Sequence, residues 1–96
     1  MAHCPAKLLQ DIGSLLEEVR SLKLLKETQP GIFYLKDKGF LHFHIDKENR
    51  RWADIRDGND WGTPVDLPFS PSKKVQKNFM EEVKARYWQL VGEFQK

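Results

Sequence analysis

The fold is decided by one stretch in the middle of the chain, which reads Phe40-Leu41-His42-Phe43-His44-Ile45-Asp46. Apolar and polar side chains alternate along it, and successive side chains of a β-strand point to opposite faces of a sheet. The odd-numbered apolar residues therefore share one face, which we expect to be buried. Phe40 shares the other face with both histidines and Asp46. This pattern predicts a strand with one buried face and one solvated face.

The next strand, which we expect from Arg51 to Arg56, fixes the pairing between the two strands. Its apolar residues Ala53 and Ile55 suit the buried face. A five-residue loop, residues 46–50, keeps them there, whereas a loop one residue shorter would turn a charged aspartate toward the core. The predicted cross-strand pairs are His44 with Trp52 and His42 with Asp54. The polar face would then present His42, His44, Trp52, Asp54, Arg56 and Phe40.

A helix is expected before these strands. Apolar residues at helical spacing predict that it runs from about Pro5 to about Glu27, and residues 28–31 would end it. A strand from Ile32 to Lys36 would follow, and a tight turn would join it to the central strand. The leucine stripe could form a coiled-coil seam, but it is wider than two positions per heptad. We therefore expect the helix to lie on the sheet.

A further strand and a second helix are expected after the central strands. The strand, around Thr63 to Leu67, would be confined to a sheet edge because Pro64 has no N–H to donate. The helix would begin at Ser70 and Pro71, as N-cap and first helical residue. We predict one α+β domain, residues 1–96. It has two layers: an N-terminal helix, a three- to four-stranded antiparallel meander and a C-terminal helix.

Composition narrows the class of protein. The 96 residues are 40% hydrophobic and 31% charged, which is typical of a globular domain. Cys4 is the single cysteine, and no segment resembles a signal peptide, so we expect a cytoplasmic location. The sequence has no run of 18 consecutive apolar residues, so it predicts no membrane span. A net charge of +2 is too small to indicate nucleic-acid binding. We expect a monomer or a weak homodimer.

Three kinds of function fit the polar face. His42 and His44 point to one side, and Asp54 could complete a three-ligand metal site. The same residues could carry acid–base chemistry, since a carboxylate beside an imidazole orients its tautomer. In a non-catalytic role, Trp52 and its polar neighbours could bind a small molecule or a peptide, and Arg56 could bind an anionic group of that ligand. An ordinary solvated sheet carries similar residues, so we expect no cofactor and no tight metal site.

Polar residues also gather where the last helix is expected to begin. They are Ser70, Ser72, Lys73 and Lys74. A helix N-terminus attracts anions, so these residues are candidates for binding phosphate. A solvated helix start is the simpler interpretation, because the cluster has no glycine-rich loop.

We interpret the chain as a non-catalytic binding or interaction module. Its polar face would contact an unidentified protein or a small molecule. The alternative is a small metal-dependent or acid–base enzyme that uses His42, His44 and Asp54. Large rings at Trp52 and Phe40 would be costly to leave bare in water, so either residues 57–69 or a partner should cover them.

Overall fold

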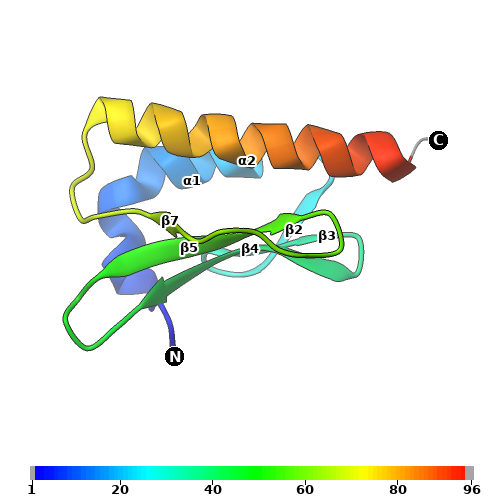
Figure 1. Cartoon of the computed structure of the whole chain (residues 1–96). Coiled ribbons are helices and arrows are strands. Elements are labelled where there is room, and N and C mark those ends of the chain that lie inside the picture. The colour runs from blue at the N-terminus through cyan, green and yellow to red at the C-terminus, as the bar shows by residue number, and fades with distance from the viewer. Residues whose placement is uncertain (1, 95–96) are drawn as a thin grey trace.

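The computed structural model describes residues 2–94, and its two helices lie on one face of an antiparallel sheet (Figure 1). This confirms the predicted two-layer α+β fold, with more strands than the predicted three or four. The helical elements are a 3-10 helix η1 (Ala6–Ile12), α1 (Gly13–Arg20) and α2 (Lys73–Phe94). The strands are β1 (Ala2–His3), β2 (Leu25–Gln29), β3 (Ile32–Leu35), β4 (Lys38–Ile45), β5 (Arg51–Asp57), β6 (Asp60–Trp61) and β7 (Val65–Asp66). In residues 2–94 no helix is long and apolar enough to cross a membrane.

The first helix is shorter than predicted. We expected helix to Glu27, but α1 ends at Arg20 and β2 begins at Leu25, pairing antiparallel with β3. Arg20 then reaches across the turn, with its Nε 2.6 Å from Oε1 of Glu27. Glu27 Oε2 also accepts a hydrogen bond from the Gly31 N–H at 3.0 Å. Pairing with β3 and these local bonds outweigh the weak helical preference of the segment.

The central strands pair as predicted. β4 and β5 form an antiparallel ladder in which His44 faces Trp52 and His42 faces Asp54. The five-residue loop between them is held by Asp46, whose Oδ1 accepts hydrogen bonds from the N–H groups of Glu48 and Arg50 at 2.9 Å.

The prediction for Phe40 is wrong. The pairing of β4 with β3 shifts by one residue, because Phe33 faces Leu41 while Tyr34 faces Gly39. This irregularity leaves Phe40 as an extra residue, as in a β-bulge, and strict alternation stops there. Phe40 is fully buried, and its ring meets Tyr87 of α2 edge-on at 6.3 Å.

The core lies between the sheet and the helices. Phe43 of β4 stacks on Phe79 of α2 with ring centroids 6.0 Å apart. The fully or almost fully buried residues of this layer come from η1 and α1 (Ile12, Leu15, Val19), from the sheet (Phe33, Leu35, Leu41, Ala53, Ile55) and from α2 (Phe79, Val83, Tyr87). Because the whole core is on this side, the opposite face of the sheet is open to other uses.

The predicted fourth strand is present as β7, which pairs with β5, but α2 begins later than expected. The N–H of Val75 bonds to Ser72 Oγ at 3.2 Å, so Ser72 is the capping residue. Ser70 has a positive φ of 49°, and its N–H bonds to Asp11 Oδ2 at 2.7 Å. Ser70 therefore belongs to the link with η1, and the prediction that it caps α2 is wrong.

Arg51 joins the N-terminal and C-terminal segments from inside the molecule. Its side chain has no exposed area, and its guanidinium forms two bonds to the Asp11 carboxylate at 2.7 and 2.9 Å. The remaining N–H groups donate to three backbone carbonyls, of Leu8, Leu67 and Pro68. A single buried cation thus fixes η1 and the chain after β7 against β5.

Candidate functional site: the polar face of the sheet

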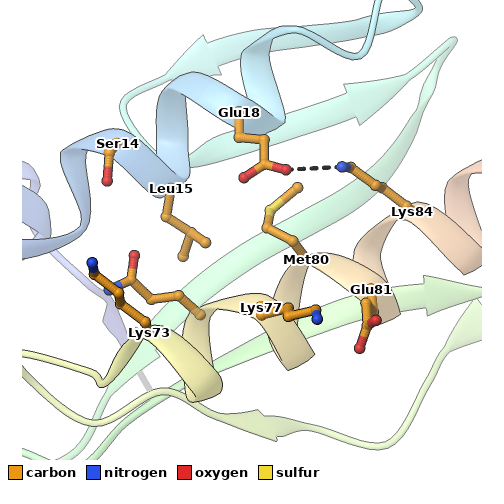
Figure 2. Close-up of a pocket in the computed structure, with 9 residues that line it drawn as sticks. Ser14, Leu15, Glu18, Lys73, Lys77, Met80, Glu81 and Lys84 are labelled. Carbon is orange, nitrogen blue, oxygen red and sulfur yellow. Dashed lines mark hydrogen bonds and ion pairs between the residues drawn. The ribbon is translucent and has the colours of Figure 1, made fainter.

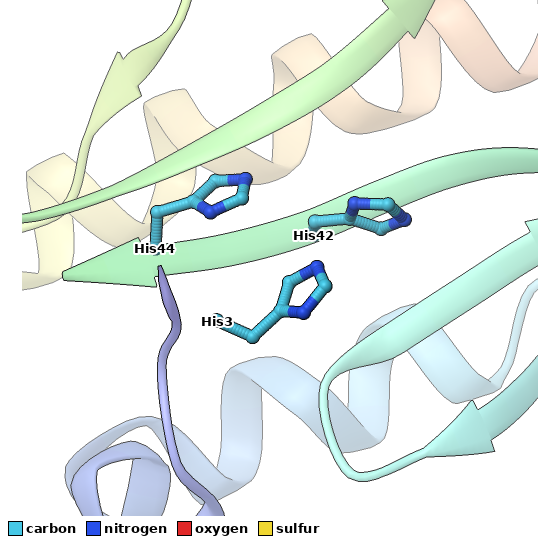
Figure 3. Close-up of side chains that lie close together, drawn as sticks. All are labelled: His3, His42 and His44. Atoms are coloured by element: carbon cyan, nitrogen blue, oxygen red, sulfur yellow. The ribbon is translucent and has the colours of Figure 1, made fainter. Parts of the chain in front are cut away.

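The structure brings the predicted polar-face residues together on the side of the sheet away from the helices. His42 and His44 come from β4, and Trp52, Asp54 and Arg56 come from β5. Figure 3 shows His42 and His44 beside a third imidazole, that of His3.

His44 is the most enclosed of the three histidines, with 8% of its surface exposed. Its Nε2 lies 2.9 Å from Oδ2 of Asp54, its diagonal neighbour on β5. Its ring stacks on Trp52 at 5.5 Å with an interplanar angle of 28°. The other nitrogen, Nδ1, is buried and has no hydrogen-bond partner in residues 2–94. The Asp54 contact favours a proton on Nε2, which leaves the lone pair of Nδ1 unused.

His42 is partly covered by Trp61, whereas we expected residues 57–69 or a partner to cover Trp52 and Phe40. The two ring centroids are 4.7 Å apart, and Trp61 belongs to β6 within residues 57–69. His42 Nε2 is buried and lacks a hydrogen-bond partner in the described part of the chain. Burial lowers the pKa of His42, and the nearby imidazoles of His3 and His44 lower it further.

His3 is the residue of this cluster that the sequence did not reveal. β1 pairs with β4 so that His3 faces His44, and the Cys4 N–H continues the pairing with a bond to the Phe43 carbonyl at 2.9 Å. The His3 ring centroid lies 5.1 Å from that of His42 and 5.3 Å from that of His44. One nitrogen from each of the three rings lies within 4.8 Å of the other two. The arrangement has the residue types of a metal site, with Asp54 beside the cluster instead of in it.

Arg56 is used by the sheet itself. Its Nε donates to the Gly39 carbonyl at 2.5 Å and its Nη1 to the Asn59 carbonyl at 3.1 Å. The guanidinium carbon also lies 4.9 Å from the centre of the Trp61 ring. Arg56 thus holds the β5–β6 turn and places Trp61 over His42. Binding of an anion by Arg56 stays a prediction.

A hollow of about 540 Å³ opens on the sheet beside Trp52. It is lined by Trp52, Asp54, Asp46, Arg50, Pro64 and Asp66. The three carboxylates and one guanidinium leave two net negative charges at neutral pH. Trp52 is half-buried and supplies the aromatic wall, so this end of the polar face combines an apolar surface with acidic groups.

The candidate anion cluster lies elsewhere, at the start of α2. Of its four residues only Lys73 lines the neighbouring hollow between α1 and α2, which has a volume of about 500 Å³ (Figure 2). That hollow also contains acidic groups, and Lys84 Nζ already bonds to Glu18 Oε2 there at 2.8 Å. Binding of phosphate by Ser70, Ser72, Lys73 and Lys74 stays a prediction.

No protein-family model matches the chain, and no curated protein or solved structure is detectably similar to it.

Proposed function

We propose that this chain is a non-catalytic binding module, and that its ligand site is the hollow beside Trp52. The observation that carries the proposal is the composition of that hollow: one aromatic wall, three aspartates and one arginine. Its volume, about 540 Å³, is in the range of small-molecule and side-chain pockets. The matching ligand is a cationic group, such as the amine or guanidinium of a basic peptide.

The carboxylates around the hollow have acceptor atoms to spare. Asp46 uses Oδ1 for the two backbone bonds of its loop, and Asp54 has Oδ2 beside His44. Asp66 is paired only loosely, with its Oδ1 3.5 Å from Arg50 Nη2, and both side chains are well exposed. A cation entering the hollow would meet the free oxygens of these groups and the face of Trp52, which attracts cations through its ring quadrupole.

The test is a calorimetric titration with a short capped peptide of alternating Lys and Gly, compared with the same peptide carrying Glu for Lys. Because the whole chain has a net charge of +2, binding of the basic peptide would report a local acidic site. Asp66→Asn should weaken binding about two- to five-fold, the effect of one exposed charge. Asp37→Asn, at an exposed turn position, is the matched control and should change nothing. Equal affinity for the basic and the acidic peptide would remove the proposal.

A catalytic role for His42, His44 and Asp54 is the second candidate, favoured by the 2.9 Å contact of His44 with Asp54. A carboxylate in this position orients an imidazole for proton transfer. If the candidate is right, the chain should accelerate hydrolysis of an activated ester, and His44→Asn should remove that acceleration. Equal rates for the two proteins would exclude it.

A further inference from the structure

We propose that His3, His42 and His44 form a binding site for a transition-metal ion of the zinc class, with Asp54 contacting the far nitrogen of His44 and orienting its ring. This site goes beyond the proposed cation-binding hollow: its three ligands do not line that hollow, and only Asp54 takes part in both. It differs from the metal site considered from the sequence, because His3 takes the third ligand position and Asp54 moves behind His44.

The three imidazole rings converge on one point of the polar face. β1 and β4 are hydrogen-bonded neighbours, and His3 faces His44 across that pairing. His42 lies two residues along β4 on the same face, and its ring centroid is 6.1 Å from that of His44. One nitrogen of each ring lies within 4.8 Å of the other two (Figure 3). Three imidazoles and an open position are a set that Zn²⁺ accepts, whereas Mg²⁺ and Ca²⁺ prefer oxygen ligands.

The histidine cluster has unused hydrogen-bonding capacity. His44 Nδ1 and His42 Nε2 are buried without a hydrogen-bond partner in residues 2–94, although buried polar atoms are normally paired. A metal ion bound to His44 Nδ1 would satisfy one of these atoms directly. It would also draw the cluster together, because neighbouring ligand nitrogens on tetrahedral zinc are about 3.3 Å apart for Zn–N bonds of about 2.0–2.1 Å.

Asp54 lies where metal-binding histidines usually have a carboxylate partner. Histidines that bind metals usually have their second ring nitrogen beside a carboxylate or a carbonyl, which fixes the tautomer and raises the basicity of the ligand. Asp54 Oδ2 holds this position against His44 Nε2 at 2.9 Å. The ligand that must move most is His3, which is exposed and lies in a strand of two residues, so its side chain can close on the ion.

The nearby thiol is not part of this site. Cys4 is buried, with its Sγ 3.7 Å from the Leu8 carbonyl, and burial raises the pKa of the thiol. A metal needs the thiolate, so Cys4 offers a matched control. The Cys4→Ala chain keeps all three histidines.

The experiment is a calorimetric titration of the tag-free, chelator-treated chain with ZnCl₂ at pH 7.4 and physiological salt. We expect one ion per chain. His3→Ala should weaken binding about tenfold or more, since it removes an exposed ligand and leaves the core intact. Asp54→Asn should weaken it about 10–100-fold, the usual effect of losing the carboxylate that orients a metal-binding histidine. Cys4→Ala should bind as the parent chain does.

Circular dichroism of each variant shows whether the fold is kept. An absence of saturable binding overturns the proposal, and so does binding that His3→Ala leaves unchanged in a folded chain. Because the peptide titration depends on Asp66 and the zinc titration depends on His3, either proposal can fail without the other.

Discussion

The buried Arg51–Asp11 pair gives the sharpest prediction about stability. In Asp11→Ala the guanidinium of Arg51, which has no exposed side-chain area, loses two charge-assisted hydrogen bonds at 2.7 and 2.9 Å. The backbone N–H of Ser70 loses its bond to the same carboxylate at 2.7 Å. The carbonyls of Leu8, Leu67 and Pro68 stay in place, but they do not neutralise the charge.

The magnitude follows from the burial of the two partners. Removing one partner of a buried ion pair costs about 3–5 kcal/mol of the free energy of unfolding. The Asp11 side chain is 24% exposed, so water can reach the space that it leaves and part of the charge is solvated. We therefore expect a loss near the lower end, about 3 kcal/mol.

The assay is equilibrium unfolding in urea, followed by tryptophan fluorescence, with Asp37→Ala as a control at an exposed turn position. The control should stay within about 0.5 kcal/mol of the parent chain. In a chain that already carries Arg51→Met, the Asp11→Ala change should cost much less, because no buried cation is left unpaired. A loss below about 1 kcal/mol for Asp11→Ala would mean that the Arg51 charge does not need this carboxylate.

Two further predictions concern acid and a turn. The hydrogen bonds from Arg51 lower the pKa of Asp11 below the ordinary value of an aspartate. The stability due to this pair is therefore complete at neutral pH and is lost as the pH falls through the folded-state pKa. Urea unfolding at several pH values should show this loss in the parent chain and a smaller one in Asp11→Ala. Gly31→Ala should be more destabilising than Gly58→Ala by about 1–3 kcal/mol in the same assay. Both glycines have positive φ, but a Cβ at Gly31 would lie 2.6 Å from Leu9 Cδ1, while nothing lies within 4 Å at Gly58; equal losses would show that the space near Leu9 is not limiting.

The sequence predicted the pairing of β4 with β5 because two constraints agree there. The period of two in β4 defines a buried face, and the charge of Asp54 forbids the alternative register. Those constraints are local, so they placed His42 opposite Asp54 and His44 opposite Trp52 correctly. They say nothing about the bulge at Phe40, which depends on how β3 and α2 meet the strand.

Other features depended on contacts between distant segments. The helical pattern of the first segment runs on past Arg20, and only pairing with β3 turns Leu25–Gln29 into a strand. His3 near the start of the chain carried no pattern of its own, because it reaches the site through pairing of β1 with β4. Arg51 appeared to be an ordinary strand residue, since its partner Asp11 is 40 positions away.

If the polar face of the sheet is the working surface of this protein, the imidazoles of His3, His42 and His44 should report it. We would record their ¹⁵N NMR signals at pH 7.4 while Zn²⁺ is added stepwise past one equivalent. We expect a proton on Nε2 of His44 without metal, and shifts at all three histidines that saturate together at one ion per chain. A proton on Nδ1 of His44, or a response confined to His3, would contradict it.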